Sequence, residues 1–302
     1  MMMSFSSSQP IVTGKLLVTG AGGQLGRRVV ELLLDAGAAN IVAASRDPSK
    51  LVDLAARGVE VRKADFDDPA SLPTAFAGVE RLLLISTDSL GAPGQRIAQH
   101  RAAVAAAVAA GVKHIAYTSA PSPQPQVGGG VLDDHFWSEQ AVIASGLDWT
   151  LLRHNLYAET ILMGAGQAVA SGQLFTATGG LGRSYVTRED CARVDAAALL
   201  GATGRQILDV NGPEAVTQDQ LAAMLSEVSG RPVDHIGVSA DQLRDGLIGA
   251  GLPPFVAGLL VDFDVAASQG YHAVLAPTVK ALTGREPGSV RDFLLVNKAA
   301  LG

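Results

Sequence analysis

The chain has 302 residues, of which 48% are hydrophobic and 17% are charged, and this composition excludes general disorder. The formal net charge of −6, from 23 basic and 29 acidic residues, argues against nucleic-acid binding. The single cysteine, Cys191, cannot form an internal disulfide and is typical of a protein in a reducing compartment.

Apolar runs alternate with helical patterns through the first half of the chain. The runs predict six strands, at residues 15–19, 40–44, 59–63, 81–85, 114–118 and 149–153. The segments between them predict five helices, at residues 24–35, 47–57, 69–76, 94–111 and 133–145. This alternation indicates an α/β fold of the Rossmann type, a doubly wound parallel sheet with strands buried on both faces.

The regular alternation ends after residue 153. Beyond it the sequence predicts two helices, a strand and two apolar segments that need covering, at residues 188–200, 217–229, 206–210, 247–261 and 290–296. We therefore expect one domain at 11–153, to which segments near 183–212 return. A smaller, mostly helical domain is expected at 154–302.

A glycine cluster follows the first strand and opens the first helix. Gly20, Gly23 and Gly26 fit Gly-x-x-Gly-x-x-Gly, whereas Gly-x-Gly-x-x-Gly fails at Leu25. Such a turn lets backbone amides and a helix N-terminus bind a pyrophosphate. A plain structural turn is the alternative, but the position at the start of a βαβ series favours a dinucleotide. The residues expected at the pyrophosphate are Gly20, Ala21, Gly22, Gly23, Gln24 and Leu25.

The end of the second strand distinguishes NADP from NAD. NAD sites place a carboxylate there, whereas this chain has Ser45 and Arg46, which suit a 2′-phosphate, and Lys50 adds positive charge. Asp47 is the opposing observation, and its simpler role is to cap the helix that starts at Pro48. The sequence therefore favours NADP(H), with the domain at 11–153 binding it and the domain at 154–302 binding the substrate.

Further strand ends would complete this site, although ordinary turn or strand-end roles remain the alternative for each. We expect Asp65 and Phe66 near the adenine. The residues expected along the nicotinamide ribose and the nicotinamide are Ser86, Thr87, Thr118 and Ser119.

The acid used in ketone reduction is missing. A Tyr-x-x-x-Lys dyad does not occur, because Pro121, Ile161, Glu189 and Leu275 stand four residues after the tyrosines. Transfer of hydride to a quinone needs a weaker acid, because the product is a stabilised hydroquinone anion. The candidate proton donors are His135, His154 and Tyr157. The alternatives are a solvent-facing helix start for His135 and a packing role for Tyr157.

A family resemblance rests on motifs spread along nearly the whole chain. In order they are TGAGGQLG, IVAASRDPSK, GVEVRKADFDDPASL, RLLLIS, GVKHIAYTS, LDWTLLRHNLYAE, DVAASQGY and KALTGREPGSVRDFL. The chain resembles the NmrA-like atypical short-chain dehydrogenases/reductases, especially their bacterial quinone-reductase branch. The chain departs from that branch at Gln140, where lysine is usual, and at His154-Asn155, where Asn-Gly is usual.

The resemblance implies an NADPH-dependent reductase that passes hydride to a quinone or related polycyclic aromatic acceptor. A non-catalytic NADP(H)-binding sensor and a reductase of activated C=C or C=N bonds are the alternatives. The expected partner is a small aromatic or quinone molecule, and the oligomeric state stays open.

The histidine spacing predicts no metal site. Residues 1–10 read as a polar tail rather than a secretory signal, and no apolar stretch is long enough to span a membrane, so we expect a cytoplasmic protein.

Overall fold

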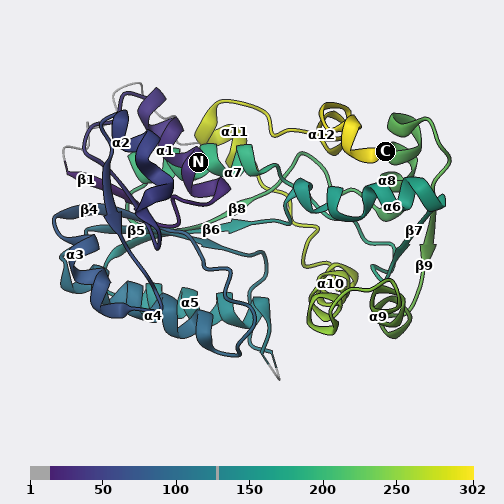
Figure 1. Ribbon diagram of the computed structural model, residues 1–302, viewed down its shortest axis with the longest axis horizontal. Coiled ribbons are helices and arrows are strands. Elements are labelled where there is room, and N and C mark those ends of the chain that lie inside the picture. Colours follow the sequence, from purple (N-terminus) through teal and green to yellow (C-terminus); the bar gives the residue numbers. More distant parts are fainter. Residues whose placement is uncertain (1–13, 127–128) are drawn as a thin grey trace. The chain divides into compact units, whose positions relative to one another are not determined.

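The computed structural model describes residues 14–126 and 129–302, so the polar tail expected at residues 1–10 lies outside the described part. Seven strands form one sheet in the order β3-β2-β1-β4-β5-β6-β8 (Figure 1). They are β1 (Lys15–Val18), β2 (Ile41–Ser45), β3 (Glu60–Lys63), β4 (Val79–Leu84), β5 (His114–Ser119), β6 (Asp148–His154) and β8 (Arg205–Val210). The predicted Rossmann-type parallel sheet is confirmed.

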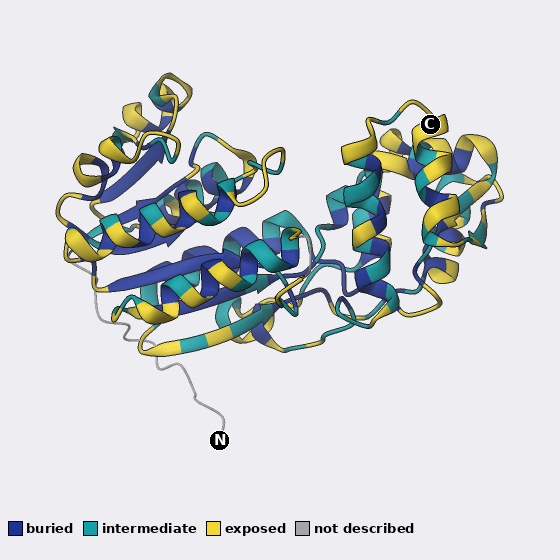
Figure 2. Ribbon diagram, turned by 90° about the horizontal axis from the view of Figure 1, so that it is seen from below, coloured by how far each residue is buried: buried dark blue, intermediate teal, exposed yellow. Residues whose placement is uncertain are grey.

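The central strands are buried because helices cover both faces of the sheet. Every residue of β2 and of β5 is buried. Figure 1 shows α3 (Leu72–Phe76), α4 (Gln95–Ala109) and α5 (Val131–Ala144) on one face and α1 (Gln24–Asp35) on the other. Figure 2 shows the central strands buried and the outer sides of these helices exposed. Parallel sheets require this two-sided cover, which explains why the strands read as continuous apolar runs.

The helix predicted at 47–57 is two shorter elements. A 3₁₀ helix at Pro48–Leu51 leads into α2 (Val52–Ala56). The Asp47 side chain accepts a hydrogen bond from the backbone N–H of Ser49, and a proline follows it at the first helical position. Asp47 therefore caps this helix, as the sequence indicated.

The chain forms two compact units, each with its own apolar core. Among the described residues, unit 1 comprises 14–119, 123–126, 129–152 and 192–208. Unit 2 comprises 120–122, 153–191 and 209–302. The core of unit 1 contains side chains of β1, β2, β4 and β5, including Tyr117, together with Phe76 of α3. The core of unit 2 contains Tyr185, Leu225 and Leu294.

Unit 2 is mainly helical. Its helices include α6 (Leu162–Ser171), α8 (Gln218–Ser229), α9 (Ala240–Gly249), α10 (Pro254–Ser268), α11 (Thr278–Thr283) and α12 (Val290–Val296), and α7 (Arg188–Gly201) starts in it. The two apolar segments noted in the sequence correspond to parts of α9 and α10 and to α12. The parallel pair β7 (Gln173–Thr176) and β9 (Asp234–Gly237) was not predicted, because each strand has four residues and begins on a polar side chain.

A buried histidine makes the stability of unit 1 depend on pH. His114 is 2% exposed, and its Nε2 lies 2.9 Å from Oγ1 of Thr150. Burial, with a contribution from the positive charge of Arg81, lowers its pKa from 6.5 to about 4. The unfolded chain therefore binds a proton between pH 6.5 and pH 4 that the folded chain does not. Stability is retained above pH 6.5 and is lost as the pH falls through this window.

We expect His114→Gln to reduce this pH dependence. Between pH 7 and pH 5, the loss of unfolding free energy should be smaller in the variant by about 2 kcal/mol, since glutamine cannot take up the proton. Urea denaturation of both proteins at the two pH values measures the difference. An equal loss in the two proteins would show that His114 does not carry this dependence.

Candidate functional site

A cavity of about 550 Å³ lies in unit 1, where β1, β2, β3 and β4 end. The chain leaves β1 toward β2 on one side, and β4 pairs on the other side, so the strand order reverses here. Ligands of doubly wound sheets bind at this reversal. Ten of the predicted residues line the cavity: Gly20, Gly22, Gly23, Gln24, Leu25, Ser45, Arg46, Phe66, Ser86 and Thr87.

The glycines of the first loop are required by its geometry. Gly20 has a φ of +62°, in the left-handed region that favours glycine. A Cβ on Gly26 would lie 2.5 Å from the backbone oxygen of Gly20, and one on Gly22 would lie 2.8 Å from Oγ of Ser45. Gly26 therefore allows α1 to pack against the loop, and Gly22 leaves room for the hydroxyl of Ser45.

The N-terminus of α1 faces this loop without a side-chain cap. Gly23 is the N-cap residue, no side chain accepts from the first-turn amides, and the first turn contains no acidic residue. Thr217, Ser239 and Ser289 cap α8, α9 and α12 through their hydroxyl oxygens, whereas α4 and α5, like α1, follow a glycine and have no side-chain cap. An uncapped helix start with glycine neighbours is suited to bind an anion through its backbone N–H groups.

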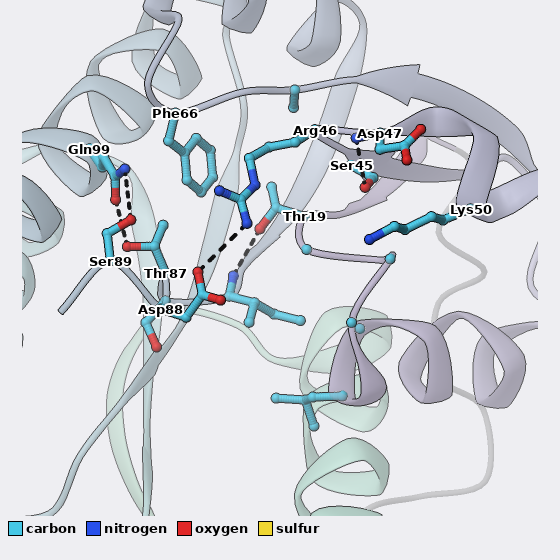
Figure 3. A pocket seen from close by; sticks show the side chains of 18 of the residues that line it. Thr19, Ser45, Arg46, Asp47, Lys50, Phe66, Thr87, Asp88, Ser89 and Gln99 are labelled. Carbon is cyan, nitrogen blue, oxygen red and sulfur yellow. Dashed lines mark hydrogen bonds and ion pairs between the residues drawn. The ribbon is translucent and has the colours of Figure 1, made fainter. Parts of the chain in front are cut away.

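Positive charge lies at the β2 end of the cavity. Figure 3 shows Arg46 directed at Asp88, and the two side chains form an ion pair of 3.8 Å. The Arg46 side chain is 62% exposed, so a ligand can reach its guanidinium. Lys50 also lines the cavity. The Asp47 carboxylate is occupied by the backbone N–H and the hydroxyl of Ser49, and these bonds lower its pKa.

Several lining residues escaped the sequence analysis. They are Thr19, Ala64, Asp67, Ile85, Asp88, Ser89 and Gln99, whereas the lining residues Gly26, Asp47 and Lys50 were noted in the sequence. Asp67 is the most informative: its Oδ1 accepts from Nε2 of Gln95 at 2.9 Å and from Nε2 of Gln99 at 2.7 Å. These bonds, with a smaller effect of Arg46, lower the pKa of Asp67. Its position two residues after Asp65, at the end of the same strand, was the available signal.

Four of the predicted cofactor-binding residues are not among those that line the cavity. The side chain of Asp65 accepts from the backbone N–H of Asp67 at 3.0 Å, so it closes the turn after β3. Ala21 is fully buried, and its N–H donates to the Ala44 carbonyl. Thr118 and Ser119, at the end of β5, are the other two.

Hydroxyl groups at the strand ends fix the cavity wall. Oγ1 of Thr118 accepts from the backbone N–H of Ser86 at 2.9 Å. The hydroxyl of Ser119 donates to the buried Glu139 carboxylate at 2.7 Å. On β1, Oγ1 of Thr19 accepts from the Ile85 N–H at 2.9 Å. Thr118 and Thr19 thus link neighbouring strand ends beneath the cavity, and Ser119 links the end of β5 to α5.

The three candidate proton donors are divided between the units. His135 belongs to unit 1 and is 5% exposed, so the alternative of a solvent-facing histidine is wrong. Its Nε2 lies 3.2 Å from Nη2 of Arg96 and its Nδ1 lies 3.0 Å from the Tyr117 hydroxyl. In unit 2, Nδ1 of His154 lies 3.2 Å from the Tyr157 hydroxyl.

Two other features are absent from residues 14–126 and 129–302. Within these ranges, no cluster of His, Cys, Asp and Glu side chains suits a metal ion. The helices described there are too short or too polar to cross a membrane.

Comparison with known proteins places this chain in a family. Residues 20–201 match the model of the NAD(P)H-binding family. The chain is 40% identical to quinone oxidoreductase 2 of Escherichia coli over 84% of this chain and 88% of that protein. A crystal structure of NADPH-dependent quinone oxidoreductase QOR2 from E. coli, complexed with NADPH, matches with a TM-score of 0.86 at 38% identity, over 92% of this chain and 98% of that one.

A second solved structure agrees. The Citrobacter sp. triphenylmethane reductase complexed with NADP(H) matches with a TM-score of 0.85 at 32% identity, over 94% of this chain and 99% of that one. The family resemblance and the cofactor class predicted from the sequence are confirmed. This chain belongs to the NAD(P)H-binding family of oxidoreductases that includes quinone oxidoreductase 2 and triphenylmethane reductase.

Proposed function

We propose that this protein is an NADPH-dependent reductase that transfers hydride to a quinone or a related polycyclic aromatic acceptor. The observation that carries the proposal is the cavity at the strand reversal, where an uncapped helix start lies next to a glycine loop. The names of the similar reductases support the acceptor class. Bound NADPH would supply the hydride, and the protein would supply binding, orientation and charge.

The cofactor would lie along the lining residues in a set order. The loop from Gly20 to Leu25 would hold the pyrophosphate through backbone N–H groups. Arg46, assisted by Lys50, would bind the 2′-phosphate. The adenine would lie beside Phe66, and the segment with Ser86 and Thr87 would follow the nicotinamide ribose.

The proton requirement favours an acceptor that gives a stable anion. The ketone-reducing Tyr-x-x-x-Lys dyad is absent from the sequence. His135 is not suited to donate a proton to the acceptor, because buried side chains engage both of its ring nitrogens. His154 and Tyr157 remain as a hydrogen-bonded pair in unit 2, which we propose as the substrate-binding part. A quinone suits this chain, since its reduced anion can be protonated by a weak donor or by water.

Acceptor-dependent oxidation of NADPH tests the proposal. We expect absorbance of NADPH to fall steadily when a quinone from a panel of benzoquinones, naphthoquinones and larger ring systems is added. Binding of NADPH without turnover of any acceptor would instead support a sensor. Turnover of activated C=C or C=N compounds alone would support the third alternative.

Arg46→Ala tests the assignment of the 2′-phosphate. Because a guanidinium–phosphate contact at an exposed position is removed, we expect the Kd for NADPH to rise about tenfold while that for NADH changes less than about threefold. Fluorescence titration with both coenzymes measures the ratio. Arg57→Ala removes an exposed arginine outside the cavity and should alter neither Kd. Equal weakening of both coenzymes by Arg46→Ala would contradict the assignment.

A further inference from the structure

Three side chains of α4 bind the same residue at the cavity edge. Thr87 lies in the stretch 85–90, which belongs to no helix or strand. Its backbone N–H donates to Nε2 of His100 at 3.0 Å. Its hydroxyl donates to Oε1 of Gln99 at 2.6 Å, and its carbonyl accepts from Nε of Arg96 at 2.9 Å. Every hydrogen-bonding group of Thr87 is thus engaged by α4, and we call Arg96, Gln99 and His100 the α4 clamp.

The direction of the His100 bonds is fixed by chemistry. The Thr87 N–H can only donate, so Nε2 of His100 accepts and the proton of the neutral ring resides on Nδ1. Burial, with a contribution from the charge of Arg96, lowers the pKa of His100 to about 3, so the ring stays neutral. Nδ1–H then donates to Oγ of Ser138 at 2.8 Å, and that hydroxyl donates to the Asp134 carbonyl at 2.6 Å.

Arg96 connects the clamp to α5 in the same way. Its side chain is 4% exposed, and Nη1 lies 3.2 Å from the carboxylate of Asp134. Nη2 donates to Nε2 of His135, since a guanidinium cannot accept, and Nδ1–H of His135 faces the hydroxyl of Tyr117 at 3.0 Å. The clamp is therefore anchored by directed hydrogen bonds inside a packed core, and it offers little freedom to move.

We propose that Arg96, Gln99 and His100 are positioning residues that hold Thr87 in place against the nicotinamide-ribose end of the cofactor. The inference rests on the proposed NADPH site. A segment without secondary structure needs outside partners for its backbone groups, and here α4 provides them. A small displacement of a binding residue weakens binding and slows the reaction. The three bonds from α4 therefore fix the position of Thr87, although Thr87 lies in a segment without secondary structure.

Substitution of His100 separates positioning from plain stability. His100→Leu removes the acceptor for the Thr87 N–H, whereas His100→Gln can restore an acceptor near the place of Nε2. We expect the Kd for NADPH to rise about tenfold in His100→Leu and to stay within about threefold of wild type in His100→Gln. His114→Leu is the matched control, because His114 is also buried in the same unit but bonds Thr150, which does not line the cavity, instead of Thr87. Its Tm should fall without a change of Kd.

A second pair of variants keeps the test independent of folding. Thr87→Val and Gln99→Met each remove one side of the 2.6 Å bond. If that bond positions Thr87, Gln99→Met should weaken NADPH binding less in the Thr87→Val background than in the wild type, because only the bonds of Gln99 to Asp67 and Ser89 are then left to lose. Independent, multiplying effects would overturn the proposal, and so would His100→Leu with wild-type affinity. Failure of the wild-type protein to bind NADPH would instead reject the proposed function.

Discussion

Gly26→Ala is expected to weaken NADPH binding at least tenfold and to destabilise unit 1. The added Cβ would lie 2.5 Å from the oxygen and 2.8 Å from the carbon of the Gly20 carbonyl, and 2.9 Å from Cα of Ala21. All three contacts are backbone atoms, so no side chain can move aside, and α1 must shift away from the loop. Overpacking of this kind costs about 1–3 kcal/mol. The shift also displaces the amides at the start of α1 that we assign to the pyrophosphate.

Gly246→Ala provides the matched control. Gly246 is in α9, and a Cβ there would meet nothing within 4 Å. Alanine favours helix over glycine by up to about 1 kcal/mol, so Tm should hold or rise and coenzyme affinity should not change. Calorimetric titration and urea denaturation of both variants give the two quantities. Wild-type affinity in Gly26→Ala would mean that the start of α1 does not hold the cofactor.

Asp264→Ala is expected to cost unit 2 about 3–5 kcal/mol of stability. The Asp264 carboxylate forms an ion pair with Arg183, and the two side chains are 9% and 8% exposed. Its second oxygen accepts from the backbone N–H of Ala177 at 2.7 Å. Alanine leaves the guanidinium buried without its counter-charge and the amide without its acceptor. The penalty of the unpaired charge dominates the loss.

Two further variants make the Asp264 result interpretable. Asp264→Leu combined with Arg183→Met replaces the pair by apolar groups and should recover most of the loss, since no lone charge remains. Glu227→Ala breaks the exposed pair with Arg291 and should leave the urea midpoint unchanged. A midpoint for Asp264→Ala equal to wild type would show that the buried pair contributes nothing.

The sheet could be predicted from the sequence because its physical signal is local. Strands such as β2 are buried on both faces, so every position is apolar or small, and glycines at fixed places mark the first turn. Gly20 and Gly26 could be identified from the glycine spacing alone. The positive φ at Gly20 and the close approach of α1 at Gly26 each allow only glycine, so the sequence records both requirements. The same holds for Asp47, whose capping role follows from the proline after it.

The remaining parts depend on contacts between distant residues. The β7–β9 pair joins two four-residue strands far apart in the chain, and neither has a run long enough to stand out. Asp67 was missed because the chain bends after β3. The Asp65 side chain bonds within this bend, and Asp67, two residues later, lines the cavity instead. His135 was read as a helix-start residue, although Arg96 and Tyr117, on α4 and β5, enclose it. No local sequence pattern predicts a hydrogen-bond network that joins α4, β5 and α5.

Calorimetric titration of the purified wild-type protein with NADPH and NADH tests the cofactor site most directly. We expect saturable binding at one site per chain, with NADPH bound at least about tenfold more tightly than NADH because of the 2′-phosphate contact. The absence of heat with both coenzymes, or tighter binding of NADH, would contradict the roles given to the glycine loop and to Arg46.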